Sequence, residues 1–177
     1  LGRAPLLALA QLRHRLGAWL DAEVDTHGSC AWVAAPVPPE KLAANRVANE
    51  EEVDRAIALA REFPDVVAAV NIGNETLVDW NDHRLSAERL VALLERTADA
   101  VDQPVTTADN YAAWVRYGSQ LAHAVDFAGV HTYPVWEHKT LAQALDFTRE
   151  NLVAVQRAVP DVPIVITEAG WATTASE

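Results

Sequence analysis

Two glutamates occupy equivalent positions in two apolar segments of the chain. Glu75 ends the segment VVAAVNIGNE, which begins at Val66, and Glu168 ends the segment VPIVITE, which begins at Val162. Short runs rich in Val and Ile are typical of buried strands, so each carboxylate is expected at the carboxyl end of a strand. Two such groups can cleave a glycosidic bond, because one donates a proton to the leaving oxygen while the other attacks or stabilises the anomeric carbon.

Further polar and aromatic residues follow the predicted strands. A tryptophan face can stack on the apolar face of a sugar ring and leave the ring hydroxyls free to hydrogen-bond. The candidates for substrate binding are Trp19, Asn74, Asp109, Asn110, His131, Tyr133, Trp136 and Trp171.

Several candidates also have a purely structural interpretation. Trp19, Trp136 and His131 could pack in the core, and Asn74 could shape a turn. Either glutamate could cap a helix. A buried carboxylate without a partner is costly to desolvate, which favours a functional role for both glutamates.

These residues need a scaffold of alternating strands and helices. The apolar runs predict strands at residues 16–20, 66–73, 104–109, 125–132 and 162–167. Between them, apolar residues recur at helical spacing. The predicted faces are Val53, Ala56, Ile57 and Ala60 after an Asn49 N-cap; Leu90, Leu93, Leu94 and Thr97 after Ser86; and Leu141, Leu145, Leu152 and Val155 before Pro160.

The order predicts an α/β fold with a parallel sheet, because strands without polar alternation are buried on both faces. An open doubly wound sheet and a closed (β/α)8 TIM barrel are the two alternatives. No glycine-rich phosphate loop follows any strand, and polar residues gather at the carboxyl ends, where barrel enzymes place their active sites. We therefore expect one catalytic barrel domain over residues 1–177, incomplete at both ends and covering about strands three to seven of eight.

A long segment interrupts this pattern after the first strand. Residues 21–48 contain Cys30, Trp32 and several prolines, and they predict an insertion loop over the active face. Cys30 is the only cysteine, so the chain cannot form an intrachain disulfide.

The formal net charge of −11 argues against nucleic acid or an anionic membrane as the main partner. An enzyme for neutral substrates fits this charge. The polar loop Asp79–His83 lacks the H-x-x-x-H and H-E-x-x-H spacings of metal sites, so no metal is expected there.

Several segments resemble glycoside hydrolase family 17, the β-1,3-glucanases. Val70–Glu75 resembles the proton-donor strand of that family, and Ile166–Trp171 resembles its nucleophile strand. Ala172 and Thr173 stand where the family has Pro and Ser. Two further segments, Phe127–Pro134 and Leu16–Leu20, are similar to the sixth and third strands of bacterial members, so the resemblance covers nearly the whole chain.

The resemblance implies a retaining double displacement without metal or organic cofactor. Glu168 would be the nucleophile and Glu75 the acid/base. Asn74 would bond the sugar 2-hydroxyl, and Tyr133 would orient Glu168. Trp136 and Trp171 would be sugar platforms for a β-glucan substrate.

The resemblance leaves other outcomes open. The acceptor site would decide between hydrolysis and transglycosylation, and a retaining barrel glycosidase for β-1,4-glucan or mannan is the main rival. A non-catalytic glycan-binding barrel and an inactive fragment are further alternatives. We expect a secreted, periplasmic or membrane-attached protein, although no run of the sequence approaches the roughly 20 apolar residues of a membrane span.

Overall fold

The computed structural model describes residues 14–28 and 35–171, in which strands and helices alternate along the chain. The elements are β1 (His14–Ala18), α1 (Pro39–Glu62), β2 (Val67–Asn74), α2 (Ala87–Ala98), β3 (Val105–Asn110), α3 (Tyr111–Leu121), β4 (Ala128–Thr132), α4 (Leu141–Ala158) and β5 (Ile164–Ala169). The predicted order is confirmed, with strand boundaries that differ by at most three residues. Among the described residues, no helix is both long and apolar enough to cross a membrane.

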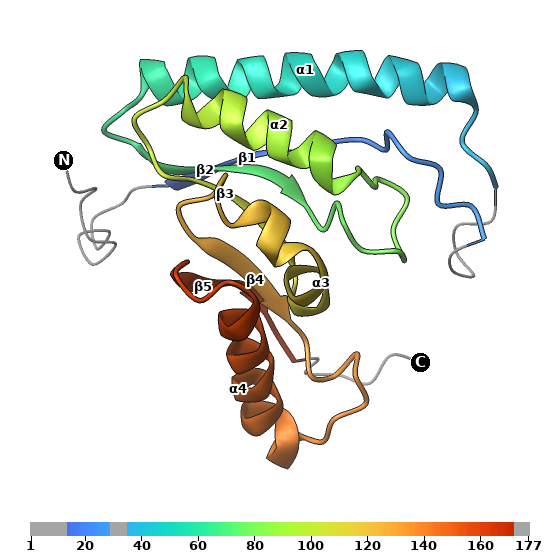
Figure 1. The fold of residues 1–177 in the computed structure, drawn as a ribbon, viewed down its shortest axis with the longest axis vertical. Helices are drawn as coiled ribbons and strands as arrows, with labels where there is room; N and C mark the ends of the chain where they lie inside the picture. The colour runs from blue at the N-terminus through green and yellow to red at the C-terminus, as the bar shows by residue number, and fades with distance from the viewer. Residues whose placement is uncertain (1–13, 29–34, 172–177) are drawn as a thin grey trace.

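The five strands form one parallel sheet in the order β1-β2-β3-β4-β5. Strand order thus follows chain order without the reversal that defines a doubly wound sheet. Figure 1 shows the sheet curving from β1 to β5, with each helix lying beside the strands it connects. This topology confirms the α/β class and the barrel-type arrangement, in which all strands point their carboxyl ends to one side.

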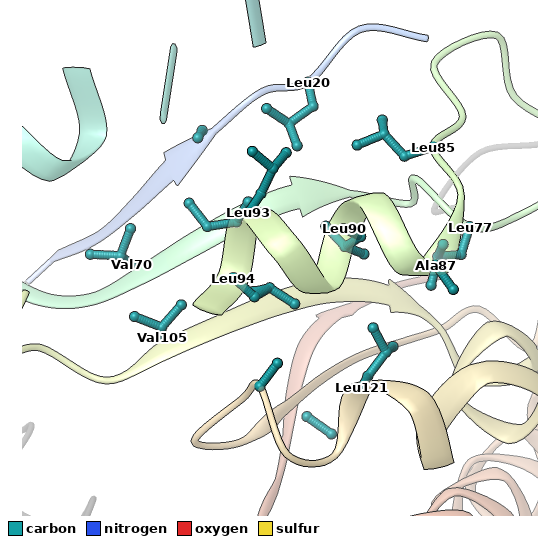
Figure 2. Packing of buried hydrophobic residues seen from close by; sticks show 14 of the residues in the cluster. Leu20, Val70, Leu77, Leu85, Ala87, Leu90, Leu93, Leu94, Val105 and Leu121 are labelled. Atoms are coloured by element: carbon teal, nitrogen blue, oxygen red, sulfur yellow. The ribbon is translucent and has the colours of Figure 1, made fainter. Parts of the chain in front are cut away.

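The hydrophobic core lies between the sheet and the helices. Figure 2 shows the α2 leucines close to Val70 of β2 and Val105 of β3. The predicted α2 face is confirmed, because Leu90, Leu93 and Leu94 are almost completely buried. Burying each of these leucines contributes about 1.5–3 kcal/mol, so α2 is fixed firmly to β2 and β3.

Helix α1 begins earlier than the sequence predicts. It starts at Pro39, a residue suited to a first helical turn, where its missing N–H is not needed. Asn49 is therefore not an N-cap but a buried residue within the helix, and its side-chain amide bonds both the N–H and the carbonyl of Asp21 at 2.8 Å. Consequently residues 39–48 of the predicted insertion loop are helical, while Cys30 and Trp32 lie outside the described residues.

The predicted apolar face of α4 is only partly correct. Leu141 and Leu145 are 73% and 60% exposed, whereas Val155 is fully buried. The helix is anchored through its C-terminal half, where Asn151 donates a hydrogen bond to the Thr132 hydroxyl of β4 at 3.0 Å. The first two turns of α4 therefore lack the cover that their leucines led us to expect.

Candidate active site

A cleft of about 640 Å³ opens at the carboxyl end of the sheet. Its walls come from the carboxyl ends of β3 and β5 and from the loops that follow β2 and β4. The lining residues are Glu75, Trp80, Asn110, Tyr133, Trp136, Glu137 and Glu168. The carboxyl ends of parallel strands are where barrel folds bind their ligands, and the structure places both predicted glutamates there.

The two glutamates converge on one histidine nitrogen. Nδ1 of His131 lies 3.1 Å from a carboxylate oxygen of Glu75 and 3.4 Å from one of Glu168. These two oxygens can therefore be no farther apart than the sum of those two distances. Two acids this close, facing one cleft, can divide proton transfer and nucleophilic attack between them.

His131 itself is completely buried in β4 beneath the cleft. Its ring meets the carboxylates and not the open cleft, and its contact with substrate stays a prediction. Its Nε2 is also buried and has no hydrogen-bond partner among the described residues. A hydrogen on Nδ1 can be donated to either carboxylate. Such a hydrogen bond would offset part of the repulsion between the two carboxylates.

Tyr133 adds a second contact to Glu168. Its hydroxyl donates a hydrogen bond to Oε2 of Glu168 at 3.0 Å, as the sequence comparison implied. Partial burial raises the pKa of Tyr133, and the bond to Glu168 and the negative charges of Glu168 and Glu75 raise it further. Tyr133 therefore remains a hydrogen-bond donor at neutral pH.

Asp109 does not line the cleft, and its contact with substrate also stays a prediction. It is 1% exposed and accepts hydrogen bonds from the backbone N–H groups of Leu77 and Asn110, at 2.9 and 2.8 Å. Burial raises the pKa of Asp109 to about 8, with a smaller contribution from Glu75, although the two backbone bonds act in the opposite direction. Asp109 thus anchors the loop that follows Glu75.

A second, smaller cleft of about 220 Å³ lies on the other side of Glu168. It is lined by Arg15, Gly17, Ala18, Trp19, Asn71, Asn74 and Glu168. The predicted residues Trp19 and Asn74 therefore gather here, apart from the rest of the candidate set. Trp171, the last described residue, is 39% exposed and lines neither cleft, while Ala172 and Thr173 lie outside the described residues.

Two residues of the larger cleft were absent from the predicted set. Trp80 is 39% exposed and follows Glu75 in a loop that was considered only as a metal site. Glu137 accepts a long hydrogen bond of 3.5 Å from the Tyr111 hydroxyl. An aromatic residue soon after a strand-end acid was the available signal for Trp80. Among the described residues, no three His, Cys, Asp or Glu side chains form a group that could hold a metal ion.

A family model described as the BtgE/BtgC glycoside hydrolase domain matches residues 30–177. No curated protein sequence matches the chain significantly. Among solved structures, the chain is similar to an endo-laminarinase from Formosa Hel1_33_131, with 25% identity and a TM-score of 0.65, over 94% of this chain and 51% of that one.

A second similar structure is a glycoside hydrolase family 17 β-1,3-glucanosyltransferase from Rhizomucor miehei. It shares 20% identity with a TM-score of 0.62, over 90% of this chain and 50% of that one. An active-site mutant of the Rhizomucor miehei β-1,3-glucanosyltransferase, in complex with laminaritriose, has 19% identity and the same TM-score over the same shares. The chain thus spans about half the length of these structures, and the last two establish similarity of fold alone.

Proposed function

Because the chain belongs to the BtgE/BtgC glycoside hydrolase domain family, we propose that it acts on β-1,3-glucan, with Glu168 as the nucleophile and Glu75 as the acid/base. The convergence of both carboxylates on Nδ1 of His131, within a cleft that also holds two tryptophans, is the observation that carries this proposal. The similarity to an endo-laminarinase supports the choice of linkage.

The contact of both acids with Nδ1 of His131 favours a retaining mechanism, because their nearest oxygens can lie no farther apart than the lower limit for inverting pairs. Retaining pairs lie about 5–5.5 Å apart, whereas inverting pairs need about 6.5–9.5 Å to admit a water molecule. In the first step, Glu168 attacks the anomeric carbon while Glu75 gives its proton to the leaving oxygen. In the second step, Glu75 takes a proton from the incoming acceptor, which displaces Glu168 and restores both groups.

The neighbouring side chains would keep these two groups in place. The hydroxyl of Tyr133 orients Glu168. The buried ring of His131 contacts Glu75 through Nδ1. Holding reacting groups in a fixed geometry lowers the barrier by reducing the entropy that must be lost on reaction. Asn74, at the edge of the second cleft, would bond the sugar hydroxyl next to the anomeric carbon.

The cleft suits a neutral sugar chain. Trp80 and Trp136 are both exposed within it and can stack on sugar rings. Among the described residues no Lys or Arg lines it, while Glu75, Glu137 and Glu168 do. An anionic polysaccharide would be repelled by these three carboxylates, so an uncharged glucan is the favoured substrate.

Transfer to a second sugar is the other candidate reaction. The exposed tryptophans lie in the same cleft as Glu75, where they could hold a sugar acceptor in place of water. Glucanosyl transfer would then follow from the same two catalytic groups.

The proposal is tested with β-1,3-gluco-oligosaccharides labelled at the reducing end, whose product lengths are followed by mass spectrometry. We expect shorter products with the protein and none with Glu168→Gln, whereas longer products would indicate transfer. Turnover of β-1,4-glucan or mannan instead of β-1,3-glucan would overturn the proposed linkage. Equal activity of Glu168→Gln and the unaltered protein would overturn the role of Glu168.

A further inference from the structure

The backbone that carries Glu75 has an unusual conformation. Glu75 has φ of +51°, a left-handed value that it shares with only one other non-glycine residue in the described part of the chain. Gly73, two residues earlier, has φ of +78°, and a Cβ there would lie 2.9 Å from a methyl carbon of Thr76. Such conformations persist only where the surrounding structure holds them, and they concentrate at functional sites.

Three hydrogen bonds hold this turn through its backbone atoms. The Glu75 N–H donates to the carbonyl of Ala108 at 2.8 Å, and the Asn81 side chain donates to the carbonyl of Glu75. The third contact joins Nε2 of His83 to the carbonyl of Asn74 at 2.9 Å. Neither Asn81 nor His83 is among the residues expected to bind substrate. Together they form hydrogen bonds to the peptide groups on both sides of the Glu75 Cα.

The partner of His83 determines where its ring carries a hydrogen. A carbonyl oxygen only accepts hydrogen bonds, so Nε2 of His83 must be the donor to Asn74. The Asn81 amide nitrogen is also near, at 3.2 Å, but it donates to the Glu75 carbonyl. Nδ1 faces a carboxylate oxygen of Asp82 at 3.3 Å.

Trp19 fixes the imidazole from the side. The centres of the Trp19 and His83 rings are 4.8 Å apart with an interplanar angle of 42°, and the His83 side chain is only 16% exposed. The indole also lines the second cleft beside Glu168. The His83 ring is therefore held between an aromatic face and the backbone that precedes the proposed acid.

We propose that His83 is a positioning residue for proton transfer by Glu75, acting through the carbonyl of Asn74. The inference rests on the proposed function, because it takes Glu75 as the acid/base. His83 touches neither the reacting atoms nor the larger cleft. Its loss would leave Glu168 able to attack but would let the turn at Glu75 relax, so that the proton is no longer aimed at the leaving oxygen.

The test compares two aryl β-glycosides of the same β-1,3-linked disaccharide, one with a 2,4-dinitrophenol leaving group and one with 4-methylumbelliferone. Dinitrophenolate departs without a proton, whereas the weaker leaving group needs one. For His83→Leu we expect kcat/KM to fall at least about tenfold with the methylumbelliferyl substrate, which is part of the roughly 10²- to 10⁴-fold contribution of a general acid, and to change little with the dinitrophenyl substrate. The ratio of the two values does not depend on how much of the protein is folded.

Two further variants sharpen the result. The side-chain nitrogen of Gln can occupy the place of Nε2, so His83→Gln should restore most of the lost kcat/KM. His123→Leu removes a histidine that is exposed beside Glu95, far along the chain from the turn, and should leave both substrates unaffected. Equal losses on both substrates with His83→Leu, or no rescue by Gln, would overturn the inference.

Glu75→Gln separates this inference from the proposed function. If Glu75 is the acid, this variant should lose the methylumbelliferyl activity by about 100-fold or more and keep the dinitrophenyl activity. The absence of any leaving-group dependence in Glu75→Gln would count against the acid role of Glu75. A clear dependence in Glu75→Gln with none in His83→Leu would count against His83 alone.

Discussion

The contacts made by single side chains determine how two carboxylates can share one cleft. Repulsion between like charges opposes their approach, and it grows as water is excluded. His131 and Tyr133 place hydrogen-bond donors against these carboxylates, at 3.1 Å from Glu75 and 3.0 Å from Glu168. The site therefore depends on donors that lie beneath or beside the acids, and these donors can be removed one at a time.

Tyr133→Phe removes the hydroxyl that orients Glu168 and keeps the ring. A hydrogen bond to a charged group is worth about 1.5–3 kcal/mol, so kcat should fall by about 10- to 100-fold while KM changes little. Steady-state kinetics on a β-1,3-gluco-oligosaccharide measure both constants. Tyr117→Phe is the control, because its hydroxyl contacts Arg84 and not the cleft. An unchanged kcat in Tyr133→Phe would show that Glu168 needs no such orientation.

Asp109→Asn should change how stability depends on pH. The folded protein holds the Asp109 proton up to a pKa of about 8, whereas the unfolded chain releases it near the ordinary value of 3.8. The folded state therefore binds more protons between these values, and this group's contribution to the free energy of unfolding is full below pH 3.8 and is lost as pH rises towards 8.

Urea unfolding at several pH values across this interval measures the slope for each protein. We expect a shallower decline of the unfolding free energy in Asp109→Asn than in the unaltered protein, with the exposed Asp161→Asn retaining the original slope. Identical slopes in all three proteins would refute the prediction.

Among the helices and strands, the sequence predicts best where a local pattern and the packing agree. Helix α2 follows its Ser86 N-cap and buries the leucine face that its spacing indicates. Helix α1 starts eleven residues before its predicted start, because residues 39–48 are largely exposed and show no regular apolar face. Asn is a residue type that commonly caps helices, but the side chain of Asn49 is hydrogen-bonded to the backbone of Asp21. Asp21 is distant in sequence, so no local pattern reveals this contact.

The candidate site shows the same division. The ends of β2 and β5 could be predicted, so both glutamates were found. Their shared contact with His131 depends on strand register, in which His131 pairs with Glu168, and on the turn at Glu75. The burial of Asp109 and His131 likewise follows from the layers around them. Sequence spacing carries no information about such layers.

Gly129 is required for the close approach of β4 to its neighbours. A Cβ at this position would lie 2.7 Å from the Thr107 carbonyl oxygen of β3 and 3.1 Å from a methyl carbon of Thr167 in β5. Gly129→Ala should therefore destabilise the protein by about 1–3 kcal/mol, as overpacking does, and displace His131 two residues later.

Gly17→Ala in β1 is a matched control, because nothing lies within 4 Å of its added Cβ. Urea unfolding of both variants tests the predicted difference in stability, and kcat of Gly129→Ala tests the displacement of His131. Equal stability of the two variants would show that β3 and β5 can move apart without cost.

On the scale of the whole molecule, charged side chains tie the first two helices together within an acidic protein. Arg89 of α2 bonds Glu23 at 2.9 Å and Glu50 of α1 at 2.6 Å, and Arg96 also contacts Glu50. The side chains of Arg89 and Glu23 are 14% and 7% exposed, so this pair is largely withdrawn from water. The formal net charge of the protein is −11. Without these arginines, Glu23 and Glu50 would add to the repulsion among its acidic side chains.

Arg89→Met should leave the Glu23 carboxylate buried without its partner. Breaking a buried pair from one side costs about 3–5 kcal/mol, so a loss near the lower end is expected for this partly exposed pair. Arg55→Met is the control, since Arg55 and its acidic partners lie on the surface of α1, where such pairs contribute about 1 kcal/mol or less. Urea midpoints compare the two, and equal shifts would contradict a special role for Arg89.

The unbroken strand order from β1 to β5 also bears on how the protein is made. From β2 onward, each strand pairs with the strand synthesised just before it. Its partner has therefore already been synthesised when the strand leaves the ribosome. Chains generally acquire structure from the N-terminal side during synthesis, and pairing with the preceding strand keeps the sequence separation of the contacts smaller than a reversed strand order would. The turn at Glu75 can thus be complete, with Ala108 already bonded to it, before Glu168 has left the ribosome.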